Sequence, residues 1–168
     1  MKEFGTISKL IVMIAVALEP ACAAEVDASE TNGLPFVEAH VQASDRNSLV
    51  LDFSITNSSN INLIIDRADV PWMSYYALTM TATKTNRSGG GVTGGLPRKV
   101  RIADPPAGII QIAPHDAITG SVALKRAFDN IEEALAVDDI LINWSFQLTE
   151  GDVKKQFKGS LLIPSTSR

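Results

Sequence analysis

The sequence predicts an all-β protein: an antiparallel β-sandwich of about eight strands with one short helix near residues 129–137. Three observations predict this class. Apolar and polar residues alternate with period two in several segments, as they do in strands with one buried face. Clusters of Ser, Asn, Asp, Gly and Pro separate these segments at short intervals. No helical pattern lies between consecutive strands, which argues against a parallel α/β sheet.

Length and charge limit the domain count and the function class. The chain has 168 residues, of which 45% are hydrophobic and 20% charged, with a net charge of −4. This composition excludes a disordered chain and a general polyanion binder. Removing residues 1–23 as a leader leaves 168 − 23 = 145 residues, enough for one hydrophobic core and too few for two comfortable ones.

The first 23 residues have the pattern of a secretory signal peptide. Lys2 and Lys9 precede nine apolar residues, 10–18, and Ala21-Cys22-Ala23 forms an A-x-A cleavage site. The apolar run is too short for a membrane-spanning helix, which needs about 20 residues. We therefore expect cleavage before Ala24 and a periplasmic or secreted location.

Cys22 leaves one alternative open. A cysteine after the apolar run resembles the bacterial lipoprotein signal, which would make Cys22 a lipid anchor. However, Glu19 and Pro20 stand where that signal has an aliphatic and a small residue. We favour plain cleavage, after which the mature chain holds no cysteine. That excludes disulfides, cysteine nucleophiles and Cys-bearing metal sites.

The sandwich domain is expected over residues 36–164. Residues 24–35 are polar and acidic without periodicity, so they predict a disordered lead-in. Alternation then predicts a strand over residues 36–43, with Val37, Ala39 and Val41 on a shared face.

The next strand, over residues 48–56, is the clearest, and its inward residues are Leu49, Leu51, Phe53 and Ile55. Two more strands are expected in this first half, over residues 61–65 and, after a connection at 66–72, over residues 74–83.

The second half continues the pattern. In residues 74–83, alternation places Tyr76, Leu78 and Met80 inward and Tyr75 outward. Residues 84–98 hold five glycines and predict a long exposed loop. Further strands are expected at the edge over 99–103, and then over 109–113, 118–124, 140–149 and from Lys155 to Ile163.

One helix and one hairpin complete the domain. Asp129 with Glu132 three residues later is typical of a capping box, which predicts a helix over residues 129–137. The last two strands form a hairpin around Glu150-Gly151-Asp152, with alternate residues from Ile140 to Leu148 inward. Residues 165–168 form the C-terminal tail.

This strand rhythm over residues 36–164 resembles the immunoglobulin and fibronectin type III class of secreted sandwiches. The resemblance implies two stacked antiparallel sheets. The Cys…Trp…Cys spacing of antibody domains is absent. No site residue is carried over from the resemblance, because a fold of this class does not specify a function.

Motifs for cofactors and catalysis are weak. Gly89, Gly91 and Gly94 satisfy G-x-G-x-x-G, but no helix follows them, so we expect a flexible hairpin loop and no cofactor. His40 and His115 are the only histidines, and there is no G-x-S-x-G motif. We expect no catalytic residue; a small hydrolase using either histidine is the alternative.

Metal sites and carboxylate pairs find no better support. Two histidines without a spacing motif do not make a structural zinc site. Met73 and Met80 with a histidine would suit copper, but Met80 shares an apolar strand face and predicts core packing. We expect no bound metal; a metal or ligand carrier is an alternative. Glu132-Glu133 and Asp138-Asp139 indicate a solvated helix face.

What remains is an aromatic and basic surface. Trp, Tyr and Arg are the residue types that carry protein interfaces. The candidate partner-binding residues are Trp72, Tyr75, Arg87, Arg98, Lys99 and Arg101. Trp72 is equally well explained as a plug at one end of the sandwich. An acidic, exported chain disfavours nucleic acid as a partner.

We therefore expect a non-enzymatic protein-binding module of the bacterial envelope, with a protein partner. One alternative is an inhibitor or immunity-type protein of an envelope hydrolase, inserting residues 84–98 into its target.

Overall fold

The computed structural model describes residues 37–43, 49–85, 92–99 and 104–166. The expected leader 1–23 and lead-in 24–35 lie outside the described residues. Within these ranges the chain is mostly β, with two short α-helices and one 3-10 helix, η1 (Arg67–Asp69). The strands are β1 (Val37–Ala43), β2 (Val50–Asn57), β3 (Leu63–Asp66), β4 (Leu78–Thr85), β5 (Val92–Leu96), β6 (Ile109–Ile112), β7 (Ala117–Ala123), β8 (Asp139–Glu150) and β9 (Val153–Ile163). The predicted all-β sandwich class is confirmed.

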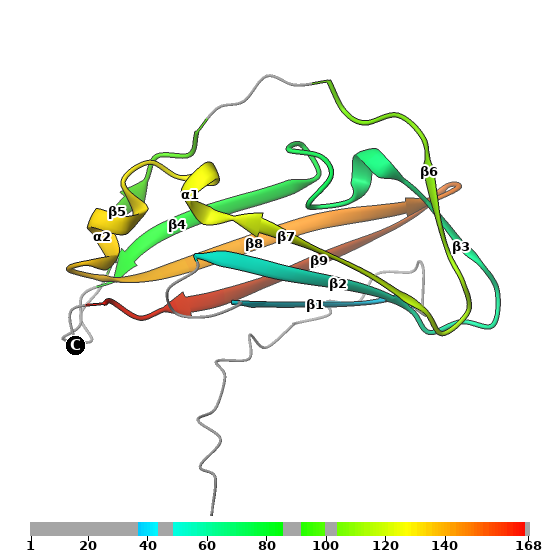
Figure 1. The fold of residues 1–168 in the computed structure, drawn as a ribbon, viewed down its shortest axis with the longest axis horizontal. Coiled ribbons are helices and arrows are strands. Elements are labelled where there is room, and N and C mark those ends of the chain that lie inside the picture. Colours follow the sequence, from blue (N-terminus) through cyan, green and yellow to red (C-terminus); the bar gives the residue numbers. More distant parts are fainter. Residues whose placement is uncertain (1–36, 44–48, 86–91, 100–103, 167–168) are drawn as a thin grey trace, which may run out of the picture.

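Two antiparallel sheets form the sandwich (Figure 1). One has the strand order β1-β2-β7 and the other β5-β4-β8-β9. The core lies between them, where Phe53 of β2 contacts Trp144 and Phe146 of β8 at ring-centroid distances of 6.3 and 6.2 Å. Edge-to-face rings at this spacing add a specific geometry to the apolar burial.

The inward faces follow the alternation in the sequence. Leu51, Phe53 and Ile55 of β2 are buried, and so are the alternate residues of β8 from Ile140 to Leu148. The β8–β9 hairpin turns at Gly151, whose φ of 58° is a conformation that suits glycine. These predictions are confirmed, because the period of a strand is a local property of the chain.

The first sheet bends into a separate two-stranded ribbon, β3-β6. Residues 50–56 pair with 117–123, and residues 63–66 pair with 109–112, so the same two segments pair twice. Asn57 sits at the corner between the two pairings and is 1% exposed. Its Nδ2 donates to the carbonyl oxygens of Ile61, Ile112 and Ala113 at 2.8, 3.0 and 3.1 Å. One buried amide therefore bonds both turns of the corner.

Each tryptophan packs over a glycine of a strand. A Cβ added at Gly120 would lie 2.2 Å from the ring of Trp72, and one at Gly159 would lie 2.5 Å from the ring of Trp144. Real Cβ atoms do not approach so closely, so both strands need glycine at these positions.

The expected loop 84–98 is only partly a loop. Residues 92–96 form β5, which pairs with β4 through Thr83↔Gly95 and Lys84↔Gly94. The prediction was wrong here because glycines carry no side-chain pattern, while the hydrogen bonds that make this strand come from β4. Residues 86–91, with Gly89 and Gly91, lie outside the described residues.

The helical region also differs from the prediction. The strand expected to reach residue 124 ends at Ala123, and the fully buried Leu124 begins α1 (Leu124–Ala127). The helix α2 (Ile131–Leu135) starts after Asn130, which makes no side-chain cap bond. The predicted capping box is therefore wrong, because Asp129 lies one residue before the cap.

The carboxylate of Asp129 instead pairs with Lys99 at 3.5 Å. Lys99 itself is in no strand, and residues 100–103 of the expected edge strand lie outside the described part of the chain. After β9, Ser165 is buried, and its amide donates to the Asp139 carboxylate.

Candidate binding groove

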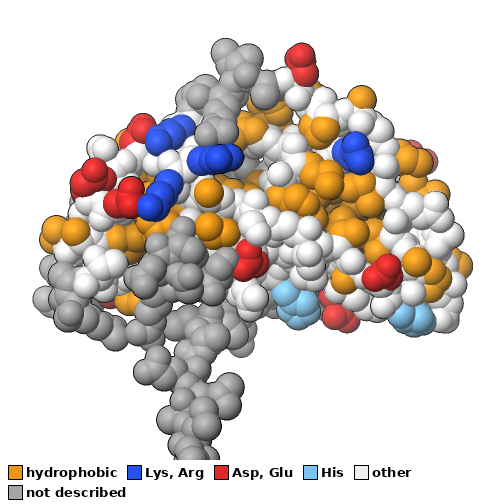
Figure 2. All heavy atoms as spheres, viewed as in Figure 1, with side chains coloured by type: hydrophobic (Ala, Val, Ile, Leu, Met, Phe, Trp, Pro, Cys, Tyr) orange, Lys and Arg blue, Asp and Glu red, His pale blue; other side chains and the backbone are white. Residues whose placement is uncertain are grey.

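A groove of about 420 Å³ opens on the side of the sandwich where β7 is the last strand of its sheet. It lies between β7 with α1 on one side and the connection 71–77 on the other, over Leu78 and Met80 of β4. We call it the β7 groove. Figure 2 shows this face, where hydrophobic side chains gather beside Lys and Arg side chains.

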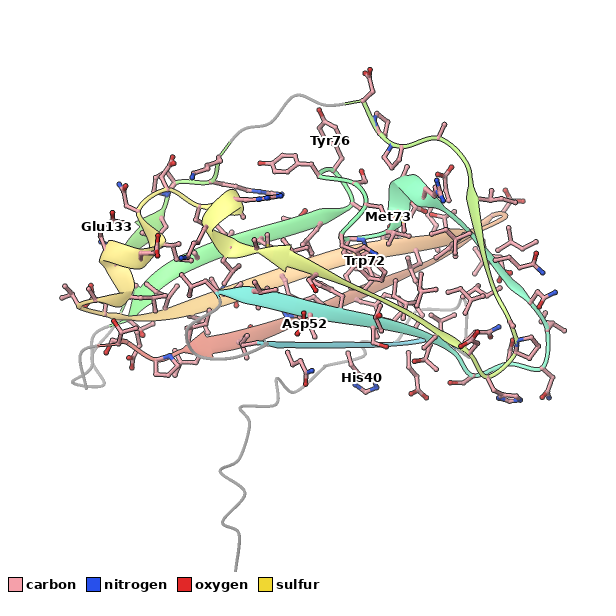
Figure 3. The ribbon with its side chains drawn as sticks, in the orientation of Figure 1. His40, Asp52, Trp72, Met73, Tyr76 and Glu133 are labelled. Atoms are coloured by element: carbon pink, nitrogen blue, oxygen red, sulfur yellow. The ribbon has the colours of Figure 1, made fainter. Side chains whose placement is uncertain are left out.

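Trp72 forms part of the groove wall and also fills the sandwich. It is half-buried, packs against the core, and its ring centroid is 6.3 Å from that of Phe53. Figure 3 shows Trp72 directed into the space between the sheets. Trp72 therefore does close one side of the sandwich, as the alternative interpretation expected, and the same side chain also lines the groove.

The two tyrosines have the opposite orientations to those predicted. Tyr76 is 59% exposed, whereas Tyr75 is half-buried. The strand β4 begins only at Leu78, so residues 75–77 form a turn and strand alternation does not apply to them. The Tyr75 hydroxyl donates to the carbonyl oxygen of Lys99, which joins the connection to the segment after β5.

Arg98 lies against this tyrosine. Its guanidinium carbon is 4.7 Å from the centre of the Tyr75 ring, and Nη2 donates to the Leu78 carbonyl oxygen at 2.6 Å. Such stacking is favourable for a guanidinium. Nε is buried and finds no hydrogen-bond partner among the described residues. The cation is thus positioned by carbonyl oxygens and an aromatic ring rather than by a carboxylate.

A second guanidinium borders the groove. Arg126 of α1 is exposed, lines the groove and makes no ion pair with any residue that the structure describes. The neighbouring Lys125 pairs with Glu132 at 2.5 Å. Arg98 and Arg126 therefore carry positive charge into the groove that the described part of the chain does not neutralise with a carboxylate.

One buried hydroxyl adds to the polar lining. Ser74 is 4% exposed, and its Oγ has no hydrogen-bond partner in the described ranges. A buried polar group normally has a partner, so this hydroxyl is an unsatisfied polar atom beneath the groove surface. Met73 beside it is 41% exposed and adds apolar surface at the groove mouth.

Of the six predicted partner-binding residues, the structure brings Trp72, Tyr75 and Arg98 together. Lys99 contributes its backbone to Tyr75 while its amine pairs with Asp129. Arg87 and Arg101 lie outside the described residues. Arg126 was not among the predicted residues, because nothing in the sequence just after an expected strand indicates that its side chain will line a groove with Trp72 from another segment.

Among the described residues, neither histidine is hydrogen-bonded to a hydroxyl group. His115 Nε2 lies 3.0 Å from Asn60 Oδ1, and the adjacent Asp116 accepts from the amide of Ala117. On the outer face of the first sheet, Ser121 Oγ donates directly to Asp52 at 2.7 Å, and His40 Nε2 lies 3.9 Å from a Glu38 oxygen (Figure 3). In a catalytic triad the histidine lies between the serine hydroxyl and the carboxylate, whereas Ser121 bonds to Asp52 directly.

Metal ligands do not gather either. Among the residues described, no three His, Cys, Asp or Glu side chains lie close enough to hold a metal ion. Met80 is buried in the core, as its strand pattern predicts, and Glu132 and Glu133 are exposed on α2.

Two further findings bear on what the chain is. None of the described helices has the length and apolar character needed to cross a bilayer. No family model, curated protein or solved structure matches the chain.

Proposed function

We propose that this protein is a non-enzymatic, exported protein-binding module of the bacterial envelope, and that the β7 groove is its contact surface. The observation that carries the proposal is an apolar groove bordered by Arg98 and Arg126, two cations without a carboxylate partner in the described chain.

The composition of the groove supports a protein partner. Trp, Tyr, Met and Arg are enriched in protein interfaces, and all four types line this groove. Arg98 is held by Tyr75 and Leu78 before any partner arrives, so little side-chain entropy is lost there on binding.

Export is supported by the leader pattern of residues 1–23, which is typical of chains sent to the periplasm or outside the cell. The absence of cysteine after Ala23 agrees with a domain held together by core packing alone.

The test uses substitutions on the groove rim that spare the core. Trp72 and Arg98 also hold the fold together, so Met73→Glu combined with Arg126→Glu is the better variant. We expect the tagged variant to recover far less of any partner from a cell-envelope extract of the source bacterium, measured by quantitative mass spectrometry. Lys158→Glu, exposed on the outer face of the other sheet, is the control. Equal recovery by the rim variant and the wild type would contradict the proposal.

A further inference from the structure

The strand β7 is an open edge of its sheet. It pairs with β2 and with no other described strand. The amide of Leu124 donates to the carbonyl oxygen of Leu49, and the amide of Asn57 donates to that of Asp116. In an antiparallel pair every second residue bonds to the neighbouring strand, so these two bonds show that the even-numbered residues of β7 bond to β2. The amides of residues 117, 119, 121 and 123 therefore point away from β2, toward the edge, where the amide of Ala117 already donates to the carboxylate of Asp116 at 2.8 Å.

Beyond Ala117, whose amide is capped by Asp116, the part of the chain that the structure describes gives this edge little of the usual protection. Proteins protect sheet edges with charged residues, prolines or bulges. The outermost strand β1 has its Val37 carbonyl oxygen capped by Lys155 at 2.8 Å, β9 carries three lysines, and β5 is short with an irregular register. By contrast, β7 reads AITGSVA and pairs in regular register along its whole length.

The edge and the groove are continuous. Ser121, Val122 and Ala123 of β7 line the groove together with Trp72 and Arg126. The half-buried side chains of β7, Ile118 and Val122, pack against the core, so a strand added beside β7 would direct alternate side chains into the same groove.

We infer that β7 binds an extended segment of a partner protein by strand addition. The segment has apolar side chains at alternate positions, which enter the groove, and a carboxylate that reaches Arg98 and Arg126. This inference rests on the proposed function and specifies its mode: main-chain hydrogen bonds provide affinity, and the groove with its two cations provides specificity.

The probe is the synthetic peptide acetyl-EVTVTVE-amide, with a glutamate at each end so that either strand direction brings a carboxylate to the arginines. Binding is measured by fluorescence anisotropy of a labelled peptide. We expect acetyl-KVTVTVK-amide to bind about tenfold more weakly or worse, because its charges meet Arg98 and Arg126. Arg126→Glu should reduce this preference.

Two N-methylated peptides test the main-chain bonds. One is methylated on the valine amides and the other on the threonine amides. In a strand only alternate amides face the neighbouring strand, so one methylated peptide should bind like the parent and the other about tenfold more weakly or worse. Blocking by threonine methylation indicates an antiparallel strand, and blocking by valine methylation a parallel one.

On the protein, Thr119→Pro removes an amide that faces the edge and leaves the bonds to β2 in place. Thr119→Pro should weaken binding of the parent peptide about tenfold. Thr119→Val, which keeps the amide, should leave that binding unchanged. Thermal unfolding checks that both variants are folded, and the pair of methylated peptides gives the same test on the wild type.

The inference is overturned if both methylated peptides bind like the parent, or if no peptide binds at about 1 mM. If the Met73→Glu and Arg126→Glu double variant nevertheless recovers less partner, the groove is still a contact surface, but it does not bind by strand addition. Peptide binding without any partner loss in that variant would instead remove the proposed function.

Discussion

At the residue scale, Gly120 determines where Trp72 lies. The inward position on β7 opposite Phe53 has no side chain, and the indole occupies that space. The tryptophan thereby closes the sandwich beside its open edge and presents one side to the β7 groove. A single missing Cβ thus helps to shape the candidate site.

Replacing Gly120 by Ala should displace Trp72. The new Cβ would lie 2.2 Å from the ring, and overpacking of this kind costs about 1–3 kcal/mol. We expect a lower free energy of unfolding in urea and a red-shifted tryptophan emission. Thr119→Ala, on the exposed outer face of the same strand, is the control and should change neither. An unshifted emission spectrum for Gly120→Ala would refute the packing described.

Lys155 on β9 is the described residue with a shifted pKa. Burial lowers the pKa of its amine below the ordinary 10.5, and the carboxylate of Glu38 opposes this effect. The amine donates to the Val37 carbonyl oxygen and lies 5.3 Å from the centre of the Phe157 ring. The folded state therefore holds this proton less tightly than the unfolded chain.

Because the folded pKa is the lower one, the unfolded chain binds more protons in the interval between the folded pKa and 10.5. The Lys155 contribution to the free energy of unfolding therefore rises as the pH rises through that interval. Lys155→Met should remove this contribution, as measured by urea unfolding from neutral pH to about 10. Lys158→Met, exposed on the same strand, should keep the wild-type slope; identical slopes for all three proteins would contradict the assignment.

At the element scale, the corner at Asn57 changes the direction of two paired segments together. The Asn57 amide bonds carbonyl oxygens in both turns, and its Oδ1 accepts from the amide and hydroxyl of Ser59. The ribbon β3-β6 then lies against β8 rather than extending the first sheet. This geometry allows the connection after η1 to reach β7.

Asn57→Asp should destabilise the corner strongly. It replaces a donor that faces three carbonyl oxygens with a buried carboxylate oxygen, and each lost buried partner costs about 1–3 kcal/mol. We expect a loss of about 3 kcal/mol or more in urea unfolding. Asn60→Asp, which changes an exposed side chain in the same turn, is the matched control and should cost far less. Similar losses for the two variants would show that the Asn57 bonds do not hold the corner.

At the scale of the whole molecule, stability comes from one core between two sheets. The chain after Ala23 contains no cysteine, so the expected mature protein cannot form a disulfide. We expect dithiothreitol to leave its thermal unfolding temperature unchanged, and intact-mass analysis of protein from the source bacterium to give a first residue of Ala24. A mass that includes a lipidated Cys22 would replace cleavage with the lipid anchor.

The features of the fold that could be predicted are those that depend on residues close together in the sequence. Leu51, Phe53 and Ile55 face inward as the alternation predicts, and the β8–β9 hairpin turns where Gly151 indicates. The orientation of Tyr75 and Tyr76 could not be predicted, because it depends on β4 beginning at Leu78. For the candidate site, Trp72, Tyr75 and Arg98 could be named from residue type alone, whereas Arg126 could not.

Sequence alone determined the β class, the inward faces of the main strands and the cysteine-free stretch after Ala23, since periodicity and composition are local properties. Only the tertiary structure decided that β5 is a strand, that Asn57 joins two turns and that Trp72, Arg98 and Arg126 border one groove. These arrangements rest on hydrogen bonds and packing between segments far apart in the chain, and the period of a single strand carries no information about them.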